Sequence, residues 1–173
     1  MDGRTICIEL FFSCAFTILL PAGSGTIFGV PLRPEMEYNK EKETWKGQMN
    51  HVHKLIGTRW ARERNLTGKG IGVAVLDTGV FPHADFARRL LGFQDMLNGK
   101  RFPYDDNSHG THVTGVLGGS GEASGGLYEG VAPGCGLIGV KVLDYKGNGS
   151  VTNLLRGLKW VRAHKEEYGI RIV

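Results

Sequence analysis

A histidine and an aspartate, far apart along the chain, are the residues best suited to proton-transfer chemistry. His109 lies in the segment SHGTH (108–112), and Asp77 ends the run VAVLD (73–77). An imidazole can take up and return a proton near neutral pH, and a partly desolvated carboxylate needs a polar partner. A carboxylate that accepts a hydrogen bond from Nδ1–H would fix the ring tautomer and leave Nε2 free to accept a proton. The two residues are therefore predicted to form a general-base pair.

The segments around Asp77 and His109 predict a strand and a helix that could bring the two side chains together. Residues 71–77 are apolar, rich in β-branched residues and bounded by glycines, which is typical of a strand buried in a parallel sheet. Asp77 would then lie at the carboxyl end of that strand, where open α/β sheets bind ligands. Residues 109–119 predict a helix that begins at His109, with Ser108 as its N-cap and Gly110 leaving room for a substrate backbone.

Strand and helix patterns alternate through the rest of the chain. A helix is predicted over 150–169, with its apolar side formed by Leu154, Leu155, Leu158, Trp160 and Val161. A further helix is predicted over 51–64, and strands over 90–96, 136–144 and 170–173. This order predicts an α/β fold with a doubly wound, mostly parallel sheet and helices on both faces.

The bulk composition argues against several classes of function. The 173 residues are 41% apolar, which is enough for one core, and the net charge of +4 is modest. The basic stretch 40–69 contains only Trp45 and Trp60 for stacking on bases, so it indicates a solvated helix surface and no nucleic-acid partner. Cys7, Cys14 and Cys135 provide neither a disulfide framework nor a zinc-type spacing. Nothing in the sequence indicates an oligomeric state.

The two ends of the chain differ from its middle. Residues 1–48 predict a leader or linker, and the apolar run 11–20 has the length of a signal-peptide core but is too short to span a membrane. Residues 49–173 are expected to hold the α/β part. Residues 170–173 begin a strand whose edge a parallel sheet would bury, so the domain is expected to be truncated at its C-terminus.

Three ordered motifs together resemble the subtilisin-like serine proteases, the subtilases. They are VAVLDTGV, NSHGTHVTG and GVAPGCGLIGVKVLDYKGNGS, and the resemblance runs from about Gly68 to Val173. It implies that Asp77 is the catalytic aspartate and His109 the general base of a triad. The nucleophilic serine of the family lies in a later Gly-Thr-Ser-type motif, and its oxyanion asparagine also follows later. No Gly-Thr-Ser occurs in these 173 residues, so the chain is expected to be the N-terminal portion of a catalytic domain and inactive alone.

The resemblance also implies a substrate site for polypeptides. The segment YKGNGS (145–150) matches the part of the family that pairs with the substrate backbone, which is β-augmentation. Gly147, Asn148 and Gly149 would line that backbone, and Val151 falls where the family lines a distal pocket. Taken alone, the same segment is also consistent with a plain glycine turn.

A calcium ion is the one cofactor that the resemblance implies, although the chemistry itself requires none. Asp85 matches an aspartate that binds structural calcium in many subtilases. The companion loop 118–130 departs from the family form, since it offers Glu122 and backbone carbonyls but no Asp or Asn. Calcium needs six or more oxygen ligands.

Two further interpretations concern location and local charge. No inhibitory propeptide is recognisable in residues 1–70, which favours a cytoplasmic enzyme, whereas a secreted one is expected if residues 1–24 act as a signal peptide. Asp105 and Asp106 precede His109 and are interpreted as solvated loop acids, or as acids that favour a basic substrate side chain.

Three rival functions remain open at the level of sequence. LDTG (76–79) resembles the motif of aspartic proteases, which are all-β proteins with a second such aspartate. His109 and His112 could ligate a metal, although no HExxH glutamate follows His109. Otherwise His112 is expected to pack or to form a structural hydrogen bond. The chain could also belong to a non-catalytic peptide-binding pseudoprotease or a broken gene product.

Overall fold

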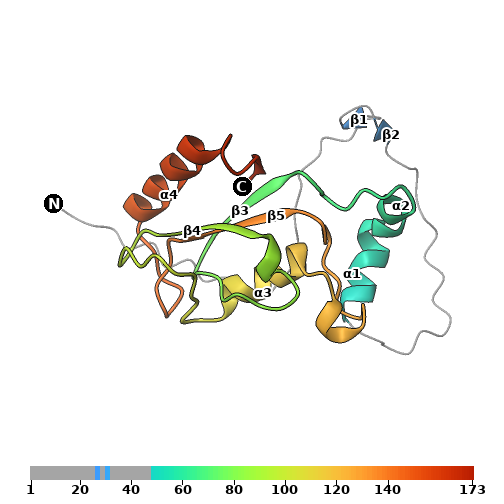
Figure 1. Cartoon of the computed structure of the whole chain (residues 1–173), viewed down its shortest axis with the longest axis horizontal. Coiled ribbons are helices and arrows are strands. Elements are labelled where there is room, and N and C mark those ends of the chain that lie inside the picture. Colours follow the sequence, from blue (N-terminus) through green and yellow to red (C-terminus); the bar gives the residue numbers. More distant parts are fainter. Residues whose placement is uncertain (1–25, 28–29, 32–47) are drawn as a thin grey trace. The chain divides into compact units, whose positions relative to one another are not determined.

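The computed structural model of the chain describes residues 26–27, 30–31 and 48–173 (Figure 1). The short strands β1 (Thr26–Ile27) and β2 (Val30–Pro31) form an antiparallel pair. They lie in a different structural unit from the one that contains Asp77 and His109. The signal-like run 11–20 lies outside the described residues, and the division of the chain at residue 48 stays a prediction.

A four-stranded parallel sheet carries the predicted site. Its strands are β3 (Gly72–Asp77), β4 (Leu90–Asp95), β5 (Gly136–Lys141) and β6 (Ile170–Ile172), in the spatial order β4-β5-β3-β6. Each neighbouring pair is parallel, and Asp77 stands opposite Lys141 in the register of β3 and β5. The last residue of β3 is thus paired with β5 at the carboxyl edge of the sheet, whereas β6 pairs only with Gly72 and Val73 at the start of β3.

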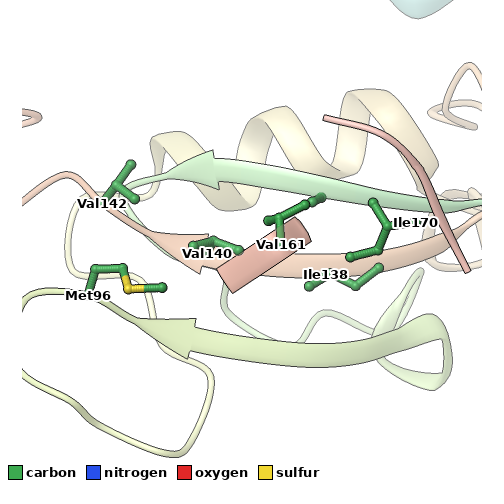
Figure 2. Packing of buried hydrophobic residues seen from close by; sticks show 7 residues of the cluster. Met96, Ile138, Val140, Val142, Val161 and Ile170 are labelled. Carbon is green, nitrogen blue, oxygen red and sulfur yellow. The ribbon is translucent and has the colours of Figure 1, made fainter. Parts of the chain in front are cut away.

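Helices cover both faces of this sheet, which confirms the predicted α/β architecture. Helices α3 (His109–Gly118) and α4 (Val151–His164) lie on opposite sides of the strands (Figure 1). On the α4 side, Val161 packs over Ile138, Val140 and Ile170 (Figure 2). On the other side, a second cluster joins Val73, Val80, Phe86, Cys135 and Leu137. Neighbouring residues of one strand enter different clusters, because successive side chains point to opposite faces.

The N-terminal helix differs from its prediction. Two helices, α1 (Gln48–Ile56) and α2 (Thr58–Glu63), replace the single helix expected over 51–64. Gly57 separates them with a left-handed backbone (φ 71°), a conformation that glycine adopts without steric cost. The helical spacing of apolar residues continues across Gly57, so the pattern alone did not indicate the break.

The apolar side of α4 also differs from its prediction. Leu154, Leu155 and Leu158 are 39%, 51% and 40% exposed, whereas Gly157 and Val161 are buried. A Cβ at Gly157 would lie 2.9 Å from a methyl carbon of Val142. The helix therefore approaches the sheet through its glycine, which turns the leucines outward. It also ends at His164, before the predicted Gly169.

The short 3-10 helices η1 (Ala87–Arg89) and η2 (Glu122–Ser124) complete the fold. In the part of the chain that the structure describes, no helix has the length and hydropathy that crossing a lipid bilayer would require.

Candidate active site

Asp77 and His109 meet at the carboxyl end of β3. Nδ1 of His109 lies 2.8 Å from Oδ1 of Asp77, and the backbone N–H of Thr78 donates to the same oxygen over 2.6 Å. Since that oxygen accepts both bonds, Nδ1 carries the proton and Nε2 can accept another. The carboxylate is 11% exposed and the imidazole 41%. The acid is therefore shielded while its partner remains accessible to a reactant.

Close backbone contact brings α3 against the end of β3. Gly110 N–H donates to Oγ1 of Thr78 over 2.9 Å. A Cβ at Gly110 would collide with the carbonyl oxygen of Gly79 and would lie 3.2 Å from Cβ of Asp77. The structure thus gives Gly110 a reason other than room for substrate, because only glycine lets the first turn of the helix approach Asp77 so closely.

Ser108 occupies the N-cap position of α3, as predicted, but its side chain does not cap the helix, and the start of α3 is organised by Asp105. Ser108 has a left-handed backbone (φ 81°) and makes no side-chain cap bond. Oδ1 of Asp105 accepts from the N–H groups of Asn107 and Ser108 and from Oγ1 of Thr78, at 2.9–3.1 Å. Its Oδ2 accepts from N and Oγ1 of Thr111, at 2.9 and 2.6 Å. One carboxylate therefore ties the end of β3 to the turn before His109.

These bonds contradict the interpretation of Asp105 as a solvated loop acid. Burial raises the pKa of its carboxyl, but the hydrogen bonds from Thr111, Asn107 and Ser108 outweigh burial and lower the pKa from 3.8 to about 2. Asp106 is also engaged, since its Oδ1 lies 2.6 Å from Nζ of Lys141.

The lowered pKa of Asp105 predicts a pH-dependent contribution to stability. Because the folded pKa is below the unfolded one, the contribution is present above about pH 4 and is lost as the pH falls toward 2. After allowance for solvent screening we expect it to be about 1–2 kcal/mol. Asp105→Asn should lower the free energy of unfolding by about this amount at pH 7 and flatten its decline between pH 4 and 2.

Denaturant unfolding at a series of pH values measures this effect. Glu122→Gln, a neutralisation at an exposed residue of the same chain, should leave both the stability at pH 7 and the decline unchanged. If the free energy of unfolding of Asp105→Asn fell as steeply between pH 4 and 2 as that of the parent protein, the assigned role of the Asp105 carboxylate would be contradicted.

The predicted substrate segment folds as a turn beside the histidine loop. Oδ1 of Asp144 accepts from the N–H groups of Lys146 and Asn148, and Gly147 has a positive φ of 82°. The side-chain amide of Asn107 donates to the carbonyl of Tyr145 over 2.9 Å and so links this turn to the loop before His109. The turn leads into α4 at Val151, which is 48% exposed. The substrate roles of Gly147, Asn148, Gly149 and Val151 stay predictions.

The surroundings of Asp85 do not fit a calcium ion. Oδ1 of Asp85 already accepts from the N–H of Ala123 over 2.8 Å. The guanidinium of Arg89 donates to the carbonyls of Asp85, Gly118 and Cys135 at 2.7, 2.5 and 2.9 Å. The guanidinium of Arg89 therefore already binds the carbonyl oxygens next to Asp85. In addition, the described residues include no cluster of three or more acidic, histidine or cysteine side chains that could hold a metal. Calcium binding at Asp85 stays a prediction that this donor set does not support.

The contacts of Arg89 predict that the region around Asp85 needs no metal ion for its stability. Arg89→Met would leave three carbonyls without their charged donor, and we expect it to lower the thermal midpoint by about 5–10 °C. Arg88→Met, at the exposed neighbour, should change it by less than about 2 °C. Scanning calorimetry of both variants, with calcium and with a chelator, measures this. A calcium-dependent rise of the parent midpoint by several degrees would contradict it.

Two rival interpretations do not agree with this geometry. Aspartic proteases are all-β, and the parallel α/β sheet excludes that fold here. A metal site formed by His109 and His112 is not supported, because Nδ1 of His109 bonds to Asp77. His112, expected to pack or to form a structural hydrogen bond, is exposed.

Two organising residues were not recognised from sequence. Thr78 follows the strand as an ordinary turn residue, and no pattern marked it. Lys141 did carry a signal, because a charge inside the apolar run GLIGVKVLD must find partners if the strand is buried.

Comparison with known proteins places residues 68–173 in one family. A model of the subtilase family matches that range. The chain is 49% identical over 104 residues to the serine protease AprX of Bacillus subtilis, 60% of this chain and 24% of that protein. It is 44% identical over 100 residues to subtilisin Savinase of Lederbergia lenta, 58% of this chain and 36% of that protein.

Structural comparison agrees with these sequence matches. The crystal structure of a cold-adapted subtilisin-like serine proteinase superposes with a TM-score of 0.50 at 36% identity, covering 56% of this chain and 33% of that one. The chain thus spans about a quarter to a third of the length of these relatives.

Proposed function

The chain belongs to the subtilase family, and we propose that it is the part of a serine endopeptidase that supplies the aspartate and the histidine of the catalytic triad. The observation that carries this proposal is the 2.8 Å contact between Nδ1 of a half-exposed imidazole and a shielded carboxylate at a strand end. The serine and the oxyanion donor would come from sequence outside these 173 residues, so the chain alone would not cleave peptides.

The proposed reaction is acyl transfer to a serine hydroxyl. Asp77 holds the ring of His109 with Nε2 facing outward. Nε2 takes the proton of the serine as its oxygen attacks the peptide carbonyl, and then gives that proton to the departing amine. The buried carboxylate stabilises the positive charge that the ring carries between these two events. Neither step requires a cofactor.

Polypeptides are the proposed substrates. The bond from Asn107 to Tyr145 places the turn at 145–150 beside the histidine loop. An extended substrate lying along that turn would therefore have a peptide bond near Nε2 of His109, and Val151 would border it further along.

Hydrolysis of a fluorogenic peptide by the complete protein tests this proposal. We expect the activity to be blocked by a serine-directed phosphonate and to be unaffected by pepstatin or by chelators that strip zinc. Hydrolysis that survives the phosphonate would contradict the serine mechanism.

A further inference from the structure

Lys141 is a charged residue that lies buried at the carboxyl end of β5. Its side chain is fully buried, at 0% exposed. Nζ donates to the carbonyls of Thr78 and Leu143, at 2.5 and 2.8 Å, and to Oδ1 of Asp106 at 2.6 Å. The ring of Tyr104 lies 5.2 Å from Nζ. An ammonium group has three donors, and all three are used.

The three acceptors belong to three different functional segments. Thr78 follows Asp77 at the end of β3, Asp106 lies in the loop that leads to His109, and Leu143 lies between β5 and the turn at 145–150. These segments are distant in sequence and converge on one nitrogen atom. A lysine that served only to fill space would not need acceptors from each of them.

Backbone bonds complete the connection between the two strand ends. The carbonyl of Asp77 accepts from the N–H groups of Val142 and Leu143, at 2.9 and 3.2 Å. The side chain of Lys141 adds a bond in the same direction, to the carbonyl of Thr78, and also donates to the carbonyl of Leu143 in its own segment. The ammonium adds a third link, from the end of β5 to the histidine loop, through Oδ1 of Asp106.

Desolvating an ammonium is costly, so a buried lysine is retained only where its contacts compensate. Its removal would leave the carbonyls of Thr78 and Leu143 and a carboxylate oxygen of Asp106 without this donor. We propose that Lys141 is a positioning residue that fixes the Asp77 segment, the His109 loop and the 142–149 segment relative to one another. This inference rests on the proposed function, since it concerns the geometry of that reaction.

The first test is kinetic and uses the complete protease. Lys141→Met should lower kcat/KM by about 10–100-fold, because small displacements of reacting groups are costly. Both parameters should change: kcat falls because the pair is displaced, and KM rises because the turn at 145–150 moves. A loss of folded protein would lower kcat alone. Lys159→Met removes an exposed lysine from α4 and should match the parent enzyme.

The second test, hydrogen–deuterium exchange of the same variants, is independent of activity. Lys141→Met should speed exchange in 78–80, 104–110 and 142–149 and leave α4 and β6 protected. If the complete protein hydrolyses no peptide, the proposed function fails while this measurement still decides the role of Lys141. Exchange that rises evenly through the sheet, or a kcat/KM within twofold of Lys159→Met, would overturn the inference.

The Asp106 variants keep the inference testable if Lys141→Met does not fold. The side chain of Asp106 is 41% exposed, so the fold should tolerate its truncation. Asp106→Ala should lower kcat/KM by about 5–10-fold. Asp106→Asn should recover most of that loss, since its amide oxygen can still accept from Nζ. Equal activity of both variants and the parent enzyme would overturn the role of this contact.

Discussion

Replacing His109 with alanine in the complete protease should lower kcat/KM by at least about 10⁴-fold. The variant loses the only group in the described part of the site whose free nitrogen can take the serine proton. Because the imidazole is 41% exposed, its removal opens no large cavity, and the free energy of unfolding should change by less than about 1 kcal/mol. Peptide hydrolysis and denaturant unfolding measure the two effects separately.

Asp77→Asn should also reduce turnover, but by a smaller factor. Thr78 N–H and His109 Nδ1–H both donate to one oxygen of Asp77, so an asparagine would keep its oxygen there. The tautomer of His109 would survive, while the negative charge that stabilises the imidazolium would be lost. We expect a decrease of about 10³–10⁴-fold.

Glu166→Gln provides the control for charge removal, because Glu166 is 70% exposed and distant in sequence from the pair. It should retain the parent activity. Near-normal turnover in either His109→Ala or Asp77→Asn would refute the assigned roles.

Gly110→Ala is expected to lower both the stability of the fold and the activity of the complete protease. Its new methyl group would collide with the carbonyl oxygen of Gly79 and press on Cβ of Asp77. The first turn of α3 would have to move away from β3, which breaks the bond between His109 and Asp77. We expect a loss of about 2–4 kcal/mol in the free energy of unfolding and of about 100-fold in kcat/KM.

Gly115→Ala, in the same helix, is the matched control. A Cβ there would lie 3.9 Å from the nearest atom, a ring carbon of Phe86. Alanine favours helix over glycine by up to about 1 kcal/mol, so this variant should be as stable as the parent or more so, with full activity. Equal effects of the two substitutions would show that close approach to β3 is not the reason for glycine at position 110.

The fold was largely predictable because its signals are local. Runs of β-branched residues between glycines marked β3 and β5, and the alternation of strands with helices predicted the α/β sheet. The placement of Asp77 at a strand end and of His109 at a helix start followed from the same patterns. Motif order then added the family, which the comparisons confirm.

The contacts that organise the site were harder to predict, because they depend on the third dimension. Asp105 was interpreted as a solvated acid since nothing in DDNSHG shows that its carboxylate folds back onto Thr111 and Thr78. The outward turn of Leu154 and Leu155 depends on Gly157, whose small size matters only once the distance to the sheet is known. The periodicity of the sequence gives no information on the distance between α4 and the sheet.

The strand order has a consequence for how the protein is made. β3 precedes the other strands of its sheet in the chain, yet it pairs with β5 and β6 and not with β4, the next strand to emerge from the ribosome. Parallel pairings between distant segments close slowly. During synthesis the carbonyl of Asp77 therefore stays without its donors, the N–H groups of Val142 and Leu143, until β5 and the residues that follow it have been translated.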